Sequence, residues 1–242
     1  MSSKLMLHSG AREVSLSELA AVPTPAPIDR WYPIGHHAVI QTVETSLFAI
    51  GVKVERSMYA LSKNNERMFA TLDLGMEIVP GVTLTAGVRN SIDKSFPLGF
   101  CAGHRVFVCD NLAFSAELLV KRKHTRFGHD RFKLDVTETV SKLAAFRAAE
   151  IERIVRMKDM VLTDRDAESL MLRAYEHEFV QARYMQKLIE AWRTPAFEGE
   201  LAERTGWALF NCFTLVMSEM ASVNPQRYAT TTIQLQALLS RG

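Results

Sequence analysis

The first regular pattern along the chain is helical. Between residues 34 and 51, apolar residues recur three or four positions apart, so they would form a stripe along one side of a helix. Gly51 follows this stripe, and glycine is a common residue just beyond a helix end. We therefore predict a helix over residues 34–51.

The chain before this helix has a different character. Pro23, Pro25 and Pro27 exclude a helix and favour an extended path. Residues 1–30 are therefore predicted to form an N-terminal arm, of the kind that packs along a domain or onto a neighbouring subunit.

After Gly51 the pattern changes to the alternation that is typical of strands. Apolar positions alternate on both sides of Lys63–Glu66, a sequence with two asparagines that favours a turn. Pro80-Gly81 and residues 91–95 mark two further connections. Residues 96–101 and 105–109 form either two strands or one strand bulged around Gly103. The pattern predicts an antiparallel meander of about four strands.

From about residue 134 the pattern is helical again. A helix is predicted over residues 136–161 with Thr137 as its N-cap, and Thr163 or Asp164 would cap the next. Further helices are predicted around residues 179–192 and 203–222, with an exposed tail after residue 228. Because strands and helices are segregated along the chain, the predicted fold class is α+β. Residues 31–242 would form one domain, with the sheet in about 31–112 and the helices in about 134–242.

Composition adds information about the cellular compartment. Hydrophobic residues make up 48% of the 242 residues, enough for a sizeable core, yet no run approaches the roughly 18 apolar residues of a membrane-spanning helix. The first residues are too polar for a secretory signal. Three cysteines cannot all pair, which favours reduced thiols. We expect a cytoplasmic protein without membrane contact.

Charge is concentrated in residues 121–133, although the whole chain carries only +2. This basic segment has six cations and one acid, a net charge of +5, so the remaining residues sum to −3. Such a concentration is typical of a phosphate-binding surface, but a solvated loop is the alternative. Phe127 and Phe132 interleave with the cations, and they would either stack on bases or anchor the segment. The six cations are Lys121, Arg122, Lys123, Arg126, Arg131 and Lys133.

Signatures of known enzyme chemistry are missing from the sequence. It contains no phosphate-binding P-loop, dinucleotide-binding glycine motif, HExxH pattern or Gly-x-Ser-x-Gly elbow. Cys101, His104 and Cys109 lack the spacing of a zinc finger. His36 and His37 are adjacent, so they would point in different directions on a helix. We predict no catalysis, no metal and no cofactor.

Polar residues near the predicted strand ends have two interpretations. Asn90, Ser91 and Asp93, with Cys109-Asp110-Asn111, would cap turns. Alternatively, Asn90, Arg105 and Asn111 would line a groove beside the basic segment and donate hydrogen bonds to sugar and phosphate.

Three motifs occur together in this chain. They are Asn90-Ser91 with R-V-x-V-C-x-N at residues 105–111, R-K-H-T at 122–125 and W-x-L-F-N at 207–211. Over about residues 30–230 the chain resembles a phage- and plasmid-encoded family, domain of unknown function 932. That resemblance implies a role in DNA metabolism or against host defences. Where relatives often have Asp-Gly-Ser, this chain has Asp93-Lys94-Ser95, which adds a positive charge.

The predicted order of elements also resembles that of Rad52-like single-strand annealing proteins. In those proteins a meandering antiparallel sheet precedes a helix, and subunits assemble side by side into rings or filaments. The resemblance implies a homo-oligomer that binds and anneals single-stranded DNA, more than RNA, during phage or plasmid recombination in the bacterial cytoplasm. The candidate binding residues are Asn90, Lys94, Arg105, Asn111, Lys121, Arg122, Lys123, Arg126, Phe127, Arg131 and Lys133.

Two other functions stay open at this point. An inhibitor of a host defence enzyme would use the proline arm and the amphipathic helices as contact surfaces. A metal-dependent nuclease would need clustered carboxylates, and Asp110, Asp130 and Asp135 are the nearest set to the basic segment.

Overall fold

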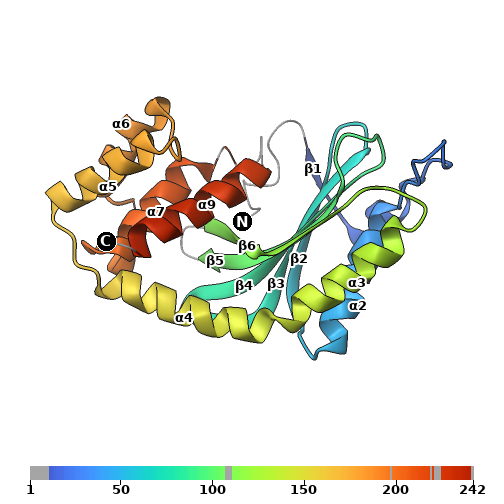
Figure 1. Cartoon of the computed structure of the whole chain (residues 1–242), viewed down its shortest axis with the longest axis horizontal. Coiled ribbons are helices and arrows are strands. Elements are labelled where there is room, and N and C mark those ends of the chain that lie inside the picture. The colour runs from blue at the N-terminus through green and yellow to red at the C-terminus, as the bar shows by residue number, and fades with distance from the viewer. Residues whose placement is uncertain (1–10, 107–110, 197, 219, 221–224, 241–242) are drawn as a thin grey trace.

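A six-stranded sheet forms the centre of the protein, as the computed structural model in Figure 1 shows. The structure describes residues 11–106, 111–196, 198–218, 220 and 225–240. Every strand is antiparallel to its neighbour, and the spatial order follows the chain. The strands are β1 (Arg12–Val14), β2 (Val54–Leu61), β3 (Arg67–Val79), β4 (Val82–Ser91), β5 (Leu98–Val106) and β6 (Asn111–Arg122).

The α+β class and the antiparallel meander are confirmed, but the described residues contain six strands and not about four. One additional strand, β1, lies within the predicted arm and pairs with β2. The other, β6, ends inside the basic segment, where its charged residues hid the strand pattern. Residues 98–106 form one strand whose pairing with β6 shifts between Cys101 and Gly103, so the bulged-strand alternative is the correct one.

Turn residues behave as their chemistry predicts. Asn65 and Gly81 take positive φ angles of 60° and 78° between β2 and β3 and between β3 and β4. Lys94, in the connection between β4 and β5, also has a positive φ, of 66°. This left-handed conformation costs a side-chain-bearing residue about 1–2 kcal/mol.

Helices cover one face of the sheet and extend past its end (Figure 1). α2 contacts β4, α3 contacts β6 and α4 contacts β3, whereas α5 and α6 lie at the far end of the molecule from α2. The described helices are α1 (Leu16–Ala20), α2 (His36–Ala49), α3 (Gly128–Ser141), α4 (Leu143–Asp159), α5 (Asp164–Glu176), α6 (Ala182–Arg193), α7 (Gly206–Val216) and α9 (Pro225–Ser240), with a short 3-10 helix at Gly199–Leu201.

Several helix boundaries differ from the predicted ones. The predicted helix over 136–161 is two helices, α3 and α4, which meet at Lys142, and Thr137 lies inside α3 and not at a cap. Thr163 does cap α5, in a capping box with Asp166. The expected exposed tail is wrong, because α9 buries leucines such as Leu235 against the core.

The predicted arm is partly integrated into the domain. Besides the pairing of β1 with β2, α1 contacts α2 and buries Leu19. Residues 23–27, which contain the three prolines, have no regular structure, as predicted. No helix in the part of the chain that the structure describes is both long and apolar enough to cross a membrane.

The core is built from rows of residues that share one face of the sheet. Ala70, Val88, Phe100 and Val120 are paired in register across β3 to β6, and all four are buried. Successive residues of a strand point to opposite faces, so the adjacent row faces away from the helices. That second row runs from Phe69 through Arg89 and Gly99 to Lys121.

The packing of α7 provides a test of the core. Trp207 is 1% exposed, and its ring lies 5.9 Å from Phe210 and 5.8 Å from His104. We expect Trp207→Ala to lower the free energy of unfolding by about 3–5 kcal/mol, measured by urea denaturation. The matched control is Phe48→Ala at a position 84% exposed, which should lose less than about 1 kcal/mol. Equal losses in both variants would contradict this account of the core.

Candidate nucleic-acid interface

The basic segment is an ordered part of the fold. Residues 121–122 end β6, residues 123–127 form a turn, and α3 begins at Gly128. In that turn the Gly128 backbone N–H donates to the Thr125 carbonyl at 2.8 Å. The cations therefore have defined directions, which the strand and the helix set.

The first two cations of the segment point to opposite faces of the sheet. Arg122 faces α3, and its guanidinium makes a two-fold ion pair with Asp135, with 2.9 Å between Nη2 and Oδ1. Hydrogen bonding to this carboxylate raises the pKa of Arg122. Lys121 lies on the helix-free face with Arg89, and partial burial together with this second positive charge lowers its pKa. Of the two, Lys121 is therefore the one available to an anion.

The cations other than Arg122 are exposed and make no ion pair within the described residues. They are Lys121, Lys123, Arg126, Arg131 and Lys133. All the cations of the segment except Arg122 are therefore available to bind an external polyanion.

The two phenylalanines of the segment have different roles. Phe132 is fully buried in the core and anchors α3, as one of the two interpretations predicted. Phe127 is 59% exposed, and the Arg126 guanidinium lies 5.7 Å from its ring centroid. Phe127 also occupies the N-cap position of α3, where no side chain caps the helix. Gly128 donates its N–H to Thr125, so the N–H groups of His129 and Asp130 are the ones in the first turn that could bind an anion.

Lys94 lies near the same end of the sheet. Its ammonium is 5.0 Å from the ring centroid of Trp31, and the neighbouring Tyr32 N–H donates to the His124 carbonyl at 3.0 Å. The structure thus brings together three segments far apart in the sequence, namely residues 28–33, 92–96 and 123–127. We call this region the basic end and define it by Lys94, Lys121, Lys123, Arg126, Phe127, Arg131 and Lys133. Its cations do not share one face, because Lys121 lies on the helix-free face of the sheet and Lys133 lines the space between α2 and α3.

Asn90 and Arg105 are inside the protein. Asn90 donates to the Ile34 carbonyl at 2.7 Å and to His36 Nδ1 at 3.0 Å. Arg105 donates to Asp73 at 3.0 Å and to Thr71 at 3.1 Å. Because both side chains are fully buried, they are not available to sugar or phosphate. Asn111 begins β6, and its side chain lies outside the described residues.

The sequence contains a signal for the ion pair of Arg105. Asp73 stands between Leu72 and Leu74 in an otherwise apolar strand. A carboxylate buried in a sheet needs a charged or hydrogen-bonding partner, and here it accepts from both Arg105 and Thr85.

Two buried histidines lie beneath the basic end. His36 Nε2 donates to the Asn65 carbonyl at 3.0 Å, which leaves Nδ1 as the acceptor for Asn90. Burial lowers the pKa of His36, and burial together with the positive charge that His36 would carry lowers the pKa of His124. The fold therefore favours the neutral form of both rings.

The described residues offer little to a metal ion. They contain no group of three His, Cys, Asp or Glu side chains close enough to hold one. Cys101 and His104 are three positions apart on β5, so they face opposite sides of the sheet. Asp135 is paired with Arg122, and Cys109 and Asp110 lie outside the described residues.

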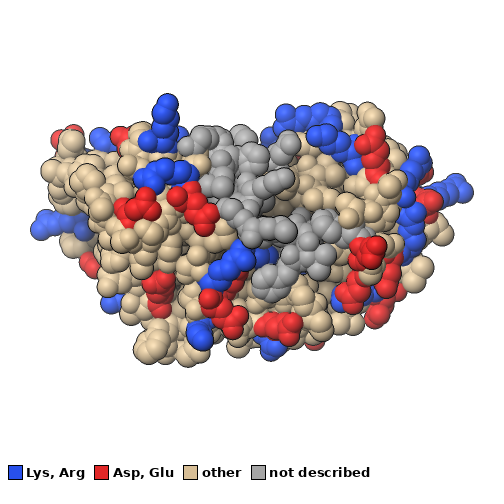
Figure 2. Space-filling model, turned by 180° about the vertical axis from the view of Figure 1, so that it is seen from behind, with Lys and Arg blue, Asp and Glu red and all other residues tan. Residues whose placement is uncertain are grey.

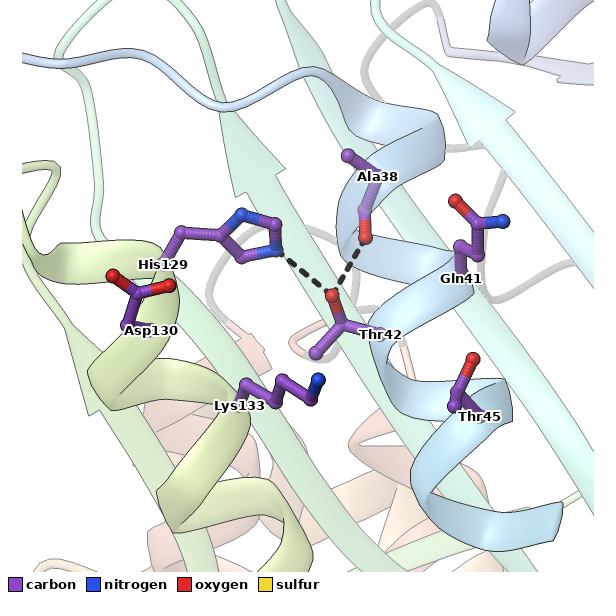
Figure 3. A pocket seen from close by; sticks show the side chains of 7 residues that line it. All are labelled: Ala38, Gln41, Thr42, Thr45, His129, Asp130 and Lys133. Atoms are coloured by element: carbon purple, nitrogen blue, oxygen red, sulfur yellow. Dashed lines mark hydrogen bonds between the residues drawn. The ribbon is translucent and has the colours of Figure 1, made fainter. Parts of the chain in front are cut away.

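A polar cavity of ≈ 290 Å³ lies between α2 and α3, next to the basic segment (Figure 3). The Thr42 hydroxyl donates to the Ala38 carbonyl at 2.8 Å and accepts from His129 Nε2 at 2.8 Å. Sequence reasoning missed this cavity because its two walls are 90 residues apart in the chain. The lining residues are Ala38, Gln41, Thr42, Thr45, His129, Asp130 and Lys133.

Charge on the face of the molecule seen in Figure 2 is mixed. Figure 2 shows basic and acidic side chains side by side over much of one face, with basic side chains also projecting at both ends of the molecule. Binding of a polyanion would therefore depend on the cations of the basic end that make no ion pair within the described residues. Comparisons of the chain with protein-family models, curated proteins and solved structures found no match.

The buried histidines make stability depend on pH. Their folded-state pKa values lie below the ordinary 6.5, so below that pH the unfolded chain binds more protons than the folded one. The free energy of unfolding should therefore fall between pH 7.5 and 5.5, by up to about 1.4 kcal/mol per pH unit for each histidine below pH 6.5. Urea denaturation at several pH values measures this.

Two variants provide the controls. His124→Gln should make the dependence weaker, because it removes one buried histidine, whereas His36 remains, as does His104, whose pKa burial lowers to about 3. His177→Gln, at an exposed position on α5's end, should leave it unchanged. Equal stability of the natural protein at pH 7.5 and pH 5.5 would contradict the assignment.

Proposed function

We propose that the protein is a non-catalytic single-stranded DNA-binding protein, and that the basic end is its binding surface. The observation that carries the proposal is a set of exposed cations without ion pairs around an exposed phenylalanine at an uncapped helix start. Phosphate binding by cations is independent of sequence, and it releases counterions. Backbone N–H groups at the start of α3 add donors for a phosphate oxygen.

The preference for a single strand comes from the aromatic side chain. Phe127 projects from the turn between β6 and α3, with Arg126 over its ring. Its exposed ring can stack only on a base that is not already stacked within a duplex, and every base offers such a surface. Cations on both sides of Phe127 would then hold the phosphates that flank the stacked base.

We also propose that the protein anneals complementary strands and acts as a homo-oligomer, a ring or a filament, in phage or plasmid recombination. Annealing requires that the phosphate charges of two strands are neutralised while the strands lie close together with accessible bases. Subunits placed side by side would provide cations for both strands. Two features support this proposal. The motifs resemble those of the phage- and plasmid-encoded family, and the order of the elements, a meander followed by helices, resembles that of Rad52-like annealing proteins. The test is the molar mass by light scattering with and without a thymidine oligonucleotide.

The charge of the basic end gives the first prediction for binding. Lys121→Glu with Lys123→Glu should weaken binding of a fluorescent 15-nucleotide thymidine strand at least about tenfold in 50 mM salt. The slope of log affinity against log salt should also become less steep, by about 1.4, because two phosphate contacts are lost. Fluorescence anisotropy at several salt concentrations measures both quantities.

Charge reversal elsewhere controls for net charge. Arg173→Glu with Lys187→Glu changes two exposed cations of α5 and α6, at the other end of the molecule. This variant should bind nearly as well as the natural protein. An equal loss in both double variants would move the site away from the basic end, and no binding by the natural protein at low salt would eliminate the proposed function.

Stacking gives a separate prediction. Phe127→Ala should weaken binding by about 1–3 kcal/mol with an unchanged salt slope, because a base loses its stacking partner while the phosphate contacts remain. Phe48→Ala, which removes another exposed phenylalanine from the end of α2, is the matched control. If Phe127→Ala bound as tightly as Phe48→Ala, phosphate contacts alone would account for binding.

A further inference from the structure

We propose that the cavity between α2 and α3 receives one base of the bound strand and prefers guanine. This inference rests on the proposed function, because the base must belong to a strand already held at the basic end. Two lining residues, Asp130 and Lys133, are themselves part of the basic segment. A strand bound at the start of α3 therefore passes the opening of the cavity.

Both helices contribute hydrogen-bonding side chains to the lining of the cavity (Figure 3). Gln41 and Thr45 lie one turn apart on α2, and both can donate or accept. Asp130 and Lys133 lie one turn apart on α3, one an acceptor and the other a donor. In the described part of the chain Asp130 makes no ion pair, so its two carboxylate oxygens are free to accept.

The inner wall of the cavity is already satisfied. Thr42 and His129 are hydrogen-bonded to each other, and the Thr42 hydroxyl also donates to the Ala38 carbonyl. These groups hold α2 against α3 and leave Gln41, Thr45, Asp130 and Lys133 for a ligand. A carboxylate beside a lysine disfavours a phosphate, because the Asp130 charge repels it. It favours a neutral ligand with adjacent donors and acceptors.

Guanine has the hydrogen-bonding edge that fits this set. Its N1–H and N2–H₂ groups are adjacent donors, which match the two oxygens of the Asp130 carboxylate. Its O6 atom accepts from the Lys133 ammonium, which points from α3 into the space between the helices (Figure 3). Adenine and cytosine each offer only one donor group on that edge, and thymine has a single N–H between two carbonyls. Single-stranded bases are commonly read on this edge.

The size of the cavity is sufficient for a base. A volume of ≈ 290 Å³ is at the lower end of ligand-binding cavities. It accommodates a flat ring system, while the sugar and phosphate stay outside among the cations.

The experiment compares four strands that differ only in every third base. Fluorescence anisotropy would measure binding of repeats of thymidine-thymidine-X, where X is guanine, inosine, adenine or cytosine. We expect the guanine strand to bind about tenfold more tightly than the adenine strand. Inosine, which lacks the N2 amino group, should fall between them.

Asp130→Asn separates base recognition from phosphate binding. This variant should lose the guanine preference while it binds a pure thymidine strand at least as tightly, because a negative charge is removed. The control is Glu138→Gln, an exposed carboxylate further along α3 that pairs with Lys142 outside the cavity. It changes the charge equally and should keep the preference. Circular dichroism would verify that both variants are folded.

The possible results have distinct meanings. Equal binding of all four strands by the natural protein would overturn the guanine preference and leave the proposed function intact. A preference that survives in Asp130→Asn would overturn the assignment to this cavity. Undetectable binding of every strand at low salt would overturn both proposals.

Discussion

Burial of one face of the antiparallel sheet under the helices is the constraint on which the rest of this structure depends. The row Ala70, Val88, Phe100 and Val120 shows the register that this burial requires across four strands. Since a shift of one residue would turn every apolar side chain outward, the register is strongly determined. The same register turns Lys121 away from the helices and directs Arg122 toward α3.

Anchoring of α3 follows from this burial. Phe132 inserts into the core, and Asp135 pairs with Arg122 at the end of β6. Only a short turn therefore separates α3 from β6, and the side chains of Lys123, Arg126 and Phe127 in this turn are exposed. The binding surface that we propose is thus a consequence of how a helix is attached to the sheet edge, and so is the cavity between α2 and α3.

Buried polar side chains connect strands to each other and connect the sheet to the helices. Asp73 and Arg105 join β3 to β5 within the sheet, and Asn90 with His36 joins β4 to the start of α2. His104 joins β5 to Glu150 of α4. Because each of these side chains is inside the protein, breaking one pair would leave an uncompensated polar group, which is more costly than losing a surface contact.

Local signals in the sequence determined the α+β class, helix α2, the turns at Asn65 and Gly81, and the cap at Thr163, because each depends on a few neighbouring residues. They also located the cluster of cations. Only the tertiary structure decided that β6 continues into that cluster, that Arg105 and Asn90 are buried, and that Thr42 of α2 bonds to His129 of α3 beside a cavity. These outcomes depend on pairing and packing between residues far apart in the chain, and periodicity along the sequence carries no information about such partners.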